Sequence, residues 1–199
     1  MSDDIRHWRP ITILNTAYKI LAKALSLRIQ PFLGELIHAT QTGFVKERSI
    51  LDNVFTFWEA TALARMREED LVVLLLDFEK AYHRVHWGFL EGTMLRMGFE
   101  DTWIRGIASL YCSVHSQVLI AGGRGPSFAL TRSVWQGCPL VPFLFLFFAE
   151  ALRMFLTAEE VGLRGLQLPV RDEDLLDAEF ANDTGPYLHV HEANLVRAE

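Results

Sequence analysis

Cysteine is scarce in this sequence, and its scarcity excludes several classes of protein. Of 199 residues only Cys112 and Cys138 are cysteines, far apart and with no His/Cys cluster near either. A disulfide scaffold needs a denser set, and a zinc site needs ligands at short spacings. The acidic opening Met1–Asp4 lacks the basic stretch and apolar run of a signal peptide. We therefore expect an intracellular protein, cytoplasmic or nuclear, with both cysteines buried as small apolar residues.

An excess of positive charge and a long apolar run are also missing. The chain has 19 Lys and Arg against 25 Asp and Glu, a formal net charge of −6. A field of that sign does not attract a phosphate backbone, so a nucleic-acid partner would need a local basic surface. The most apolar stretch, Cys138–Ala149, is interrupted by Pro139 and Pro142 and is shorter than the roughly 20 residues that cross a bilayer. We predict a core helix there and no membrane partner.

Half of the residues are apolar, enough for the core of one domain, and their spacing predicts two long helices. The first begins near Asn15 and Thr16, which can cap it, and runs to about residue 36. The second runs from Ser49 to about Arg67. We expect the core-facing side chains to be Ala17, Ile20, Leu21, Ala24 and Leu27 on the first helix, and Ile50, Val54, Trp58 and Ala62 on the second.

Several segments have the pattern of strands. Leu71–Leu76 is an apolar run that Asp77 stops, as in a strand buried on both faces. Residues 114–120 and 128–134 predict a hairpin around a glycine-rich turn at 121–126, and 178–181 and 187–190 predict a second hairpin. A helix is expected at 192–199. Helices and strands that mix without strict alternation favour an α+β fold, with residues 1–199 as a single domain.

Asp77, at the end of the first strand, and Asp183, at the tip of the second hairpin, are candidates for a shared cation site. Divalent cations such as Mg²⁺ bind carboxylate oxygens, which both residues offer. Their positions alone leave the ordinary alternative open, because aspartates at strand ends and turns usually cap or hydrogen-bond the backbone. The sequence around them favours the cation site.

Five blocks, in order along the chain, resemble the reverse transcriptases of LINE-type (non-LTR) retrotransposons. They correspond to the opening fingers motif, the block after it, two palm motifs around the first aspartate and the central loop, and the palm signature FADD. The blocks are Arg9–Asn15 with Tyr18–Lys23; Gln41–Phe44 with Arg48 and Ile50–Asn53; Leu76–Tyr82 with Arg84, Val85 and Trp87; Gln136–Leu140 with Pro142; and Phe180–Asp183.

The resemblance implies a right-hand polymerase with helical fingers at about 1–70 and, at about 71–199, a palm that has a small antiparallel sheet and some fingers elements. Such an enzyme adds deoxynucleotides to a DNA primer on an RNA template, using two Mg²⁺ ions that activate the primer hydroxyl and steady the leaving pyrophosphate. By this resemblance Asp77, the positions of Asn182 and Asp183, and the Phe78 carbonyl would hold the metals.

The same resemblance assigns residues to the deoxynucleoside triphosphate. Tyr82 would lie beneath its sugar, Gln136 and Gly137 would cover it, and Arg9 would contact the phosphates, which suit a bidentate guanidinium. Plainer roles stay open: Tyr82 as a core aromatic, Gln136 and Gly137 as a turn, Arg9 as a surface charge. The basic stripe of Lys19, Lys23 and Arg28 on the first helix is most simply a solvated face.

The chain departs from the family pattern where the chemistry depends on it. Asn182 replaces the first aspartate of FADD, leaving two carboxylates and a neutral amide around two divalent cations. His83, Trp135 and Val141 replace an aspartate, an arginine and a serine, and Pro186 removes a ladder donor, so the strand there is expected to kink or end early. We predict a very poor polymerase or none.

Three interpretations follow from these departures. The chain is an incomplete right hand, with no thumb expected within these residues, from a decayed retrotransposon copy or from a longer intact reading frame. A second interpretation is a module that keeps the fold for binding nucleic acid or protein without catalysis. A third is a non-functional relic that folds poorly because its apolar palm face is uncovered.

Overall fold

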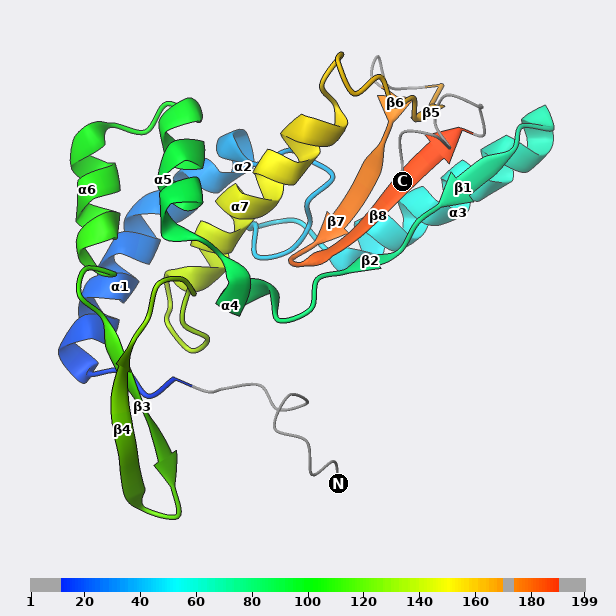
Figure 1. Ribbon diagram of the computed structural model, residues 1–199. Coiled ribbons are helices and arrows are strands. Elements are labelled where there is room, and N and C mark those ends of the chain that lie inside the picture. Colours follow the sequence, from blue (N-terminus) through cyan, green and yellow to red (C-terminus); the bar gives the residue numbers. More distant parts are fainter. Residues whose placement is uncertain (1–11, 170–173, 190–199) are drawn as a thin grey trace.

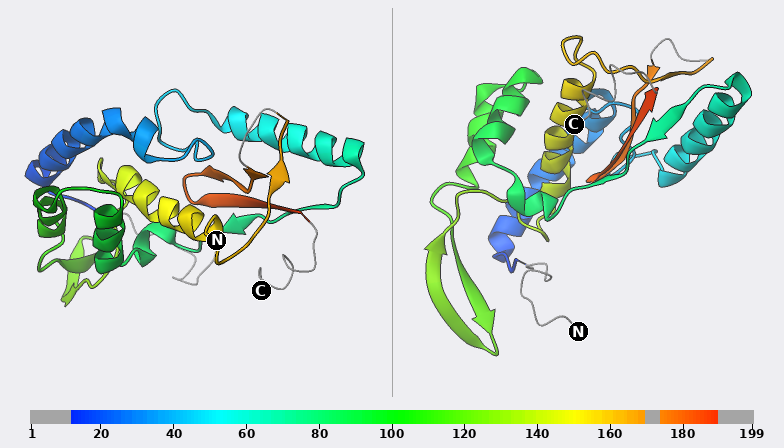
Figure 2. Two further views of the ribbon diagram at one scale, coloured as in Figure 1. Left: turned by 90° about the horizontal axis from the view of Figure 1, so that it is seen from above. Right: turned by 45° about the vertical axis from the view of Figure 1, so that its right-hand side comes forward.

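The computed structural model describes residues 12–169 and 174–189, which form an α+β fold (Figure 1). A small antiparallel sheet lies at one end with α3 (Ile50–Arg67) beside it, and α1 (Thr16–Ile29) lies toward the other end. Helix α7 (Val141–Leu156) runs between the two ends, as the view from above in Figure 2 shows. The predicted helix at 192–199 lies outside the described residues.

Helix α7 forms the centre of the hydrophobic core, which confirms the core helix predicted from its apolar sequence. Pro142 lies in its first turn, where a missing N–H costs nothing. Its fully buried side chains include Leu144, Phe145, Leu146 and Phe147. Helices α5 (Trp87–Arg96) and α6 (Asp101–Ser109) contribute Leu90, Met94 and Ile107 to the same core. Among the described residues no helix is both long and apolar enough to cross a membrane.

Helix α1 begins as predicted but buries a different face. The Asn15 side chain caps it, accepting a hydrogen bond from the Ala17 N–H at 2.8 Å. A 3₁₀ turn η2 (Gln30–Phe32) and the short α2 (Leu33–Leu36) continue it to residue 36. The expected core face was wrong: Ile20 is 67% exposed and Leu27 54%, whereas the buried residues are Ala22, Ser26 and Ile29. Because apolar residues occur on most sides of α1, their spacing did not identify the side that meets the core.

Helix α3 shows the same pattern. It begins after Ser49, as predicted, and a capping box fixes this start: the Ser49 N–H donates to Asp52 Oδ2 at 2.8 Å, and the Leu51 N–H donates to Ser49 Oγ at 3.2 Å. The buried residues are Ala60, Leu63 and Ala64, whereas Trp58, expected in the core, is 60% exposed. Small residues allow α3 to approach the sheet closely. The large apolar side chains of α3 consequently lie on its outer face.

The sheet is centred on β8 (Asp183–His189), which pairs with β7 (Asp177–Phe180) on one side and with β1 (Leu71–Val73) and β2 (Leu76–Asp77) on the other. All of these pairings are antiparallel. The predicted single strand 71–76, buried on both faces, was wrong. The strand breaks at Leu74–Leu75, and Leu75 is 86% exposed.

Pro186 explains this break. It lies in β8 opposite Leu74, whose N–H donates to the Pro186 carbonyl at 3.0 Å. Proline has no N–H with which to return a hydrogen bond, so the ladder is interrupted there. The predicted early end of the strand was also wrong, because β8 continues through Pro186 to His189. The break occurs instead in the neighbouring strand, between β1 and β2.

The first predicted hairpin forms, but its second strand was placed too late: it spans 123–129 instead of 128–134, because residues 123–126 of the predicted turn belong to the strand. Strands β3 (His115–Ile120) and β4 (Gly123–Ala129) extend away from the body (Figure 1) and are joined by Ala121 and Gly122 alone. Both turn residues have positive φ, 48° and 82°, as the tight two-residue hairpin turns require. The remaining elements are α4 (Ala81–Arg84), β5 (Leu166–Gln167) and β6 (Asp174–Leu175). Cys138 is buried as expected, whereas Cys112 is exposed.

Candidate active site

The hairpin of β7 and β8 carries the candidate catalytic residues on a tight turn. Ala181 and Asn182 connect the strands, and Ala181 has a left-handed φ of 57°. On the other side of β8, strand β2 places Asp77 directly opposite Asp183. Residues more than a hundred positions apart in sequence therefore meet at the tip, and both predicted aspartates lie beside Asn182.

The Asn182 amide lies between the two aspartates. Its Nδ2 donates to Asp183 Oδ1 at 3.2 Å and to Asp77 Oδ1 at 3.5 Å, the latter being a weak hydrogen bond. An N–H group with partial positive charge thus faces both carboxylates. No group of three or more His, Cys, Asp or Glu residues in the described part of the chain is arranged to hold a metal ion.

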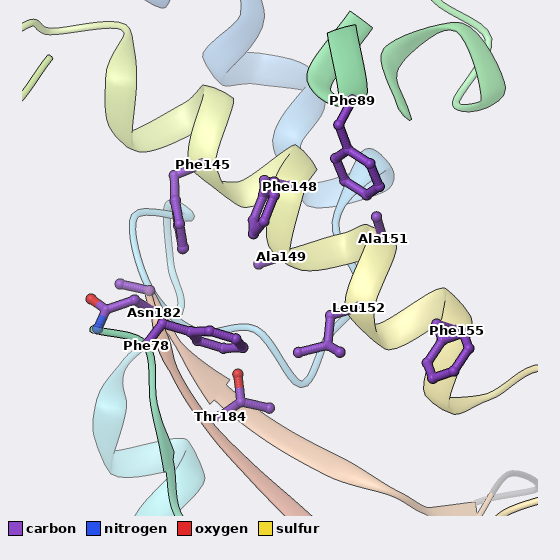
Figure 3. A pocket seen from close by; sticks show the side chains of 11 residues that line it. Phe78, Phe89, Phe145, Phe148, Ala149, Ala151, Leu152, Phe155, Asn182 and Thr184 are labelled. Atoms are coloured by element: carbon purple, nitrogen blue, oxygen red, sulfur yellow. The ribbon is translucent and has the colours of Figure 1, made fainter. Parts of the chain in front are cut away.

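Phe78 follows Asp77 and turns the chain into α4. Its carbonyl accepts a hydrogen bond from the Ala81 N–H at 3.2 Å, so one of its two lone pairs is used within this turn. Its ring enters a cavity of about 340 Å³, lined mainly by apolar side chains of α7, with Asn182 at the edge (Figure 3). The apolar wall of this cavity is formed by Phe89, Phe145, Phe148, Leu152 and Phe155.

Tyr82 lies close to the turn. It is half-buried on α4, and its ring packs against Phe145 with the centroids 4.7 Å apart. Burial raises the pKa of the Tyr82 hydroxyl, and the negative charge of Asp183 raises it further. The neutral phenol is therefore the form that faces Asp183 at neutral pH. The structure thus brings Tyr82 near Asp183, and its role toward a nucleotide stays a prediction.

The neighbouring His83 faces the loop before α7. Its Nδ1 lies 3.3 Å from Ser133 Oγ, and burial, followed by the charge of Lys80, lowers the pKa of its ring. Where the family pattern has a second acidic group, this chain therefore has a neutral imidazole. That group is directed at Ser133.

Gln136 and Gly137 lie in the loop that leads into α7. The loop is tied to α4 because the Val134 N–H donates to the Tyr82 carbonyl at 2.8 Å. Gly137 has a φ of 102°, which favours glycine. Trp135, which replaces an arginine of the family motif, is buried against the rings of Tyr18 and Tyr111, at 5.0 and 5.1 Å. Arg9 lies outside the described residues.

A layer of buried acidic residues beneath the turn was missed by the sequence reasoning. Asp177 and Glu179 of β7 lie near Glu150 of α7, and burial is the main cause that raises the pKa of each carboxyl. The pKa of Glu179 rises to about 8, since the charges of Asp177 and Glu150 add to the effect of burial. The two-residue spacing of Asp177 and Glu179 places both on one face of the strand, which could have identified them.

Polar residues of the segment 38–41 contact these carboxylates. Thr40 Oγ1 donates to Asp177 at 3.0 Å, and Gln41 Nε2 donates to Glu179 at 3.0 Å. The His38 backbone N–H donates to Glu150 at 3.0 Å. Each acidic residue thus has a hydrogen bond from this segment, of which only Gln41 belongs to a block that resembles the family.

The comparison with protein families agrees with this geometry. A family model described as reverse transcriptase (RNA-dependent DNA polymerase) matches residues 2–163. This chain belongs to the reverse transcriptase family. The matched residues of this reverse transcriptase include Asp77, Tyr82 and the loop at Gln136, and end before the β7–β8 hairpin.

Two relatives place this reverse transcriptase among the LINE-type, non-LTR retrotransposons. It is 36% identical over 179 residues to the transposon TX1 uncharacterized 149 kDa protein of Xenopus laevis, a match covering 90% of this chain and 14% of that protein. It is 28% identical over 142 residues to the retrovirus-related Pol polyprotein from type-1 retrotransposable element R2 of Popillia japonica, covering 70% and 19%. The chain therefore spans less than a fifth of the length of either relative.

Solved telomerase structures share the fold of this reverse transcriptase. One is telomerase from Candida albicans in complex with the TWJ fragment of telomeric RNA, with a TM-score of 0.54 and 13% identity over 85% of this chain and 30% of that chain. Another is apo telomerase from Candida tropicalis truncated from its C-terminal domain, with a TM-score of 0.55 and 13% identity over 91% and 36%. At this identity the likeness shows the fold, an α+β partial reverse transcriptase.

Proposed function

We propose that this chain is a fingers-and-palm portion of a non-LTR retrotransposon reverse transcriptase that has lost most or all polymerase activity. Residues 1 to about 70 contribute fingers, and about 71–199 contribute the palm with some fingers elements. The ancestral reaction is the addition of deoxynucleotides from their triphosphates to a DNA primer on an RNA template. The observation that carries the proposal is the register that sets Asp77 opposite Asp183 beside Asn182.

The residues present fit a pair of Mg²⁺ ions poorly. Two carboxylates offer oxygens, but the group between them presents its Nδ2, a donor that repels a cation. Turning the amide over would present one neutral oxygen, which still leaves the site one negative charge short of the family pattern. Loss of a mere supporting contact to a metal ligand can cost about 10–100-fold in affinity or activity, and loss of a ligand should cost more.

The rest of the proposed nucleotide site depends on shape. Tyr82, held in place by Phe145, provides a rigid ring beside Asp183 on which a deoxyribose can rest. Gln136 and Gly137 would cover the nucleotide from the loop that is bonded to the Tyr82 backbone. Arg9 would bind the phosphates. This arrangement supports positioning of a nucleotide and supplies little stabilisation for the developing charge.

Metal binding tests the proposal. We expect Asn182→Asp to raise the affinity for Mn²⁺, measured by paramagnetic broadening of the Asp77 and Asp183 resonances, by at least about tenfold. Asn15→Asp is the matched control, because Asn15 is also an exposed asparagine and aspartate keeps its capping role. Equal Mn²⁺ affinity in the unchanged chain and Asn182→Asp would contradict the assignment of this turn.

Primer extension on an RNA template is the second measurement. Extension by the unchanged chain at a rate near that of Asn182→Asp would contradict the proposed loss of activity. Salt-dependent binding of template and primer without extension in either chain would instead support a non-catalytic nucleic-acid-binding module.

The exposed apolar surface favours a second candidate, a relic without a function. Phe55, Phe57 and Trp58 of α3 are exposed, as are Leu75 and Leu76 near the site. Exposed apolar side chains promote aggregation where they form a patch. An aggregated chain or a non-cooperative thermal transition would support the relic, and a monodisperse chain that unfolds cooperatively would exclude it.

A further inference from the structure

A segment far from the turn in sequence extends the sheet at its edge. Residues Thr40–Thr42 run alongside β7, with a parallel bridge between Gln41 and Glu179. The Thr42 N–H donates to the Glu179 carbonyl at 2.8 Å, and the Glu179 N–H donates to the Thr40 carbonyl at 2.9 Å. Asn53 Nδ2 of α3 also donates to the Glu179 carbonyl, at 2.8 Å. The strand leading to the turn is therefore held along its outer edge.

The carboxamide of Gln41 binds the peptide groups of the turn itself. Gln41 is 1% exposed, and its Oε1 accepts from the Ala181 N–H at 2.8 Å and from the Gly43 N–H at 2.9 Å. Its Nε2 donates to the Ala181 carbonyl at 3.2 Å and to Glu179 Oε2 at 3.0 Å. A carboxamide has two N–H donors and two acceptor lone pairs, and all four are used here.

Gly43 brings the same segment against the turn at very close range. A Cβ atom at this position would lie 2.3 Å from the Ala181 nitrogen, a distance that no side chain can occupy. Ala181 has a left-handed φ of 57°, a conformation that costs energy for a residue other than glycine. Such a conformation persists only where surrounding contacts hold it, and Gln41 and Gly43 provide them.

Arg48 fixes the segment from behind. Its guanidinium donates to four backbone carbonyls, those of Gly34, Ile37, His38 and Gln41, at 3.0, 2.9, 2.5 and 2.9 Å. The carbonyl of Gln41 is thus held while its side chain reaches the turn. Hydrogen bonds therefore connect Arg48 to Gln41 and Gln41 to Ala181, which directly precedes Asn182.

We propose that Gln41 is a positioning residue that sets the conformation of the Ala181–Asn182 turn and thereby the placement of Asp183 opposite Asp77. The proposal rests on the proposed function for the catalytic meaning of that turn. The plainer alternative is that Gln41 is a satisfied buried polar group, whose loss weakens the whole fold evenly.

Amide hydrogen exchange distinguishes the two. In Gln41→Ala the Ala181 N–H loses its acceptor, whereas the Glu179 N–H keeps the Thr40 carbonyl. We expect Ala181 to exchange at least about tenfold faster relative to Glu179 than in the unchanged chain. Ser26→Ala is the control, because Ser26 is also 1% exposed and its hydroxyl bonds within α1. An unchanged ratio of Ala181 to Glu179 exchange in Gln41→Ala would overturn the proposal.

Gln41→Met serves if the alanine variant does not fold. It keeps a similar length and fills the buried space but has no Nε2 donors, so the Ala181 carbonyl carbon resonance should shift as its hydrogen bond is lost. An unchanged Ala181 carbonyl resonance would contradict the proposed role of Gln41. Combined with Asn182→Asp, Gln41→Met should weaken Mn²⁺ binding at least about tenfold. If Asn182→Asp alone binds no Mn²⁺, the proposed function fails, while the exchange ratio still decides the role of Gln41.

Discussion

Glu179 should make the stability of this chain fall as the pH rises. Its carboxyl is completely buried, Oε2 accepts from Gln41, and Oε1 has no hydrogen-bond partner among the described residues. Burial, with the charges of Asp177 and Glu150 adding to it, raises the pKa of Glu179 to about 8 from the ordinary 4.5. Near pH 6 the folded chain therefore holds a neutral carboxyl, and above pH 8 it must bury a charge.

The sign follows from proton binding. Between pH 4.5 and 8 the folded state keeps the Glu179 proton that the unfolded state has released, so the free energy of unfolding falls as pH rises through this window. The slope is about 1.4 kcal/mol per pH unit, which from pH 6 to pH 9 amounts to about 3 kcal/mol. Most of this loss is complete when the pH has passed the folded pKa.

Urea unfolding of the unchanged chain and of Glu179→Gln at pH 6 and pH 9 measures this effect. Glutamine keeps the shape of the side chain and carries no charge. The free energy of unfolding should therefore fall by about 3 kcal/mol less in the variant than in the unchanged chain between pH 6 and pH 9. Asp177 and Glu150 titrate in both chains, so the difference between the chains measures the titration of Glu179 together with its coupling to these two carboxyls. Glu160→Gln, an exposed position, is the control. Equal pH dependence in the unchanged chain and Glu179→Gln would refute the reasoning.

Two further substitutions test the packing around the site. Leu144→Ala in the fully buried face of α7 should reduce the free energy of unfolding by about 2–5 kcal/mol, because it leaves a cavity, as measured by urea unfolding; a loss below about 1 kcal/mol would contradict the assigned core. Arg48→Lys should lower the melting temperature measurably, because an ammonium has three donors and cannot reach four carbonyls; an unchanged melting temperature would show that these bonds contribute little.

Local patterns in the sequence predicted the elements that present the candidate site. An apolar run predicted α7, and the helical spacing that begins at Ser49 predicted the start of α3. Polar residues between two apolar segments predicted the β7–β8 hairpin, but its tip was wrong by one residue: Ala181 and Asn182 form the turn, and Asp183 begins β8. These features depend on residues close together in the chain, so the sequence alone was enough to predict these elements.

Features that depend on distant contacts could not be predicted in this way. Leu74 lies opposite Pro186, and nothing near Leu74 indicated that its strand would break there. Ile20 and Trp58 are apolar and were expected in the core, but both are exposed. Apolar residues occur on several sides of both helices, so the spacing did not show which side meets the core. The family resemblance pointed to Gln41, yet its contact with Ala181 spans 140 positions and appears only when the sheet is formed.

The β3–β4 hairpin stands away from the core, and most of its side chains are exposed on both faces. A two-stranded hairpin without a packed face is only marginally stable in water, so this one should open locally far more often than the sheet around Asp183. The two-residue turn at Ala121 and Gly122 is accordingly a position where an affinity peptide or fluorescent label can be inserted. Such an insertion would lie outside the sheet and leave the two aspartates undisturbed.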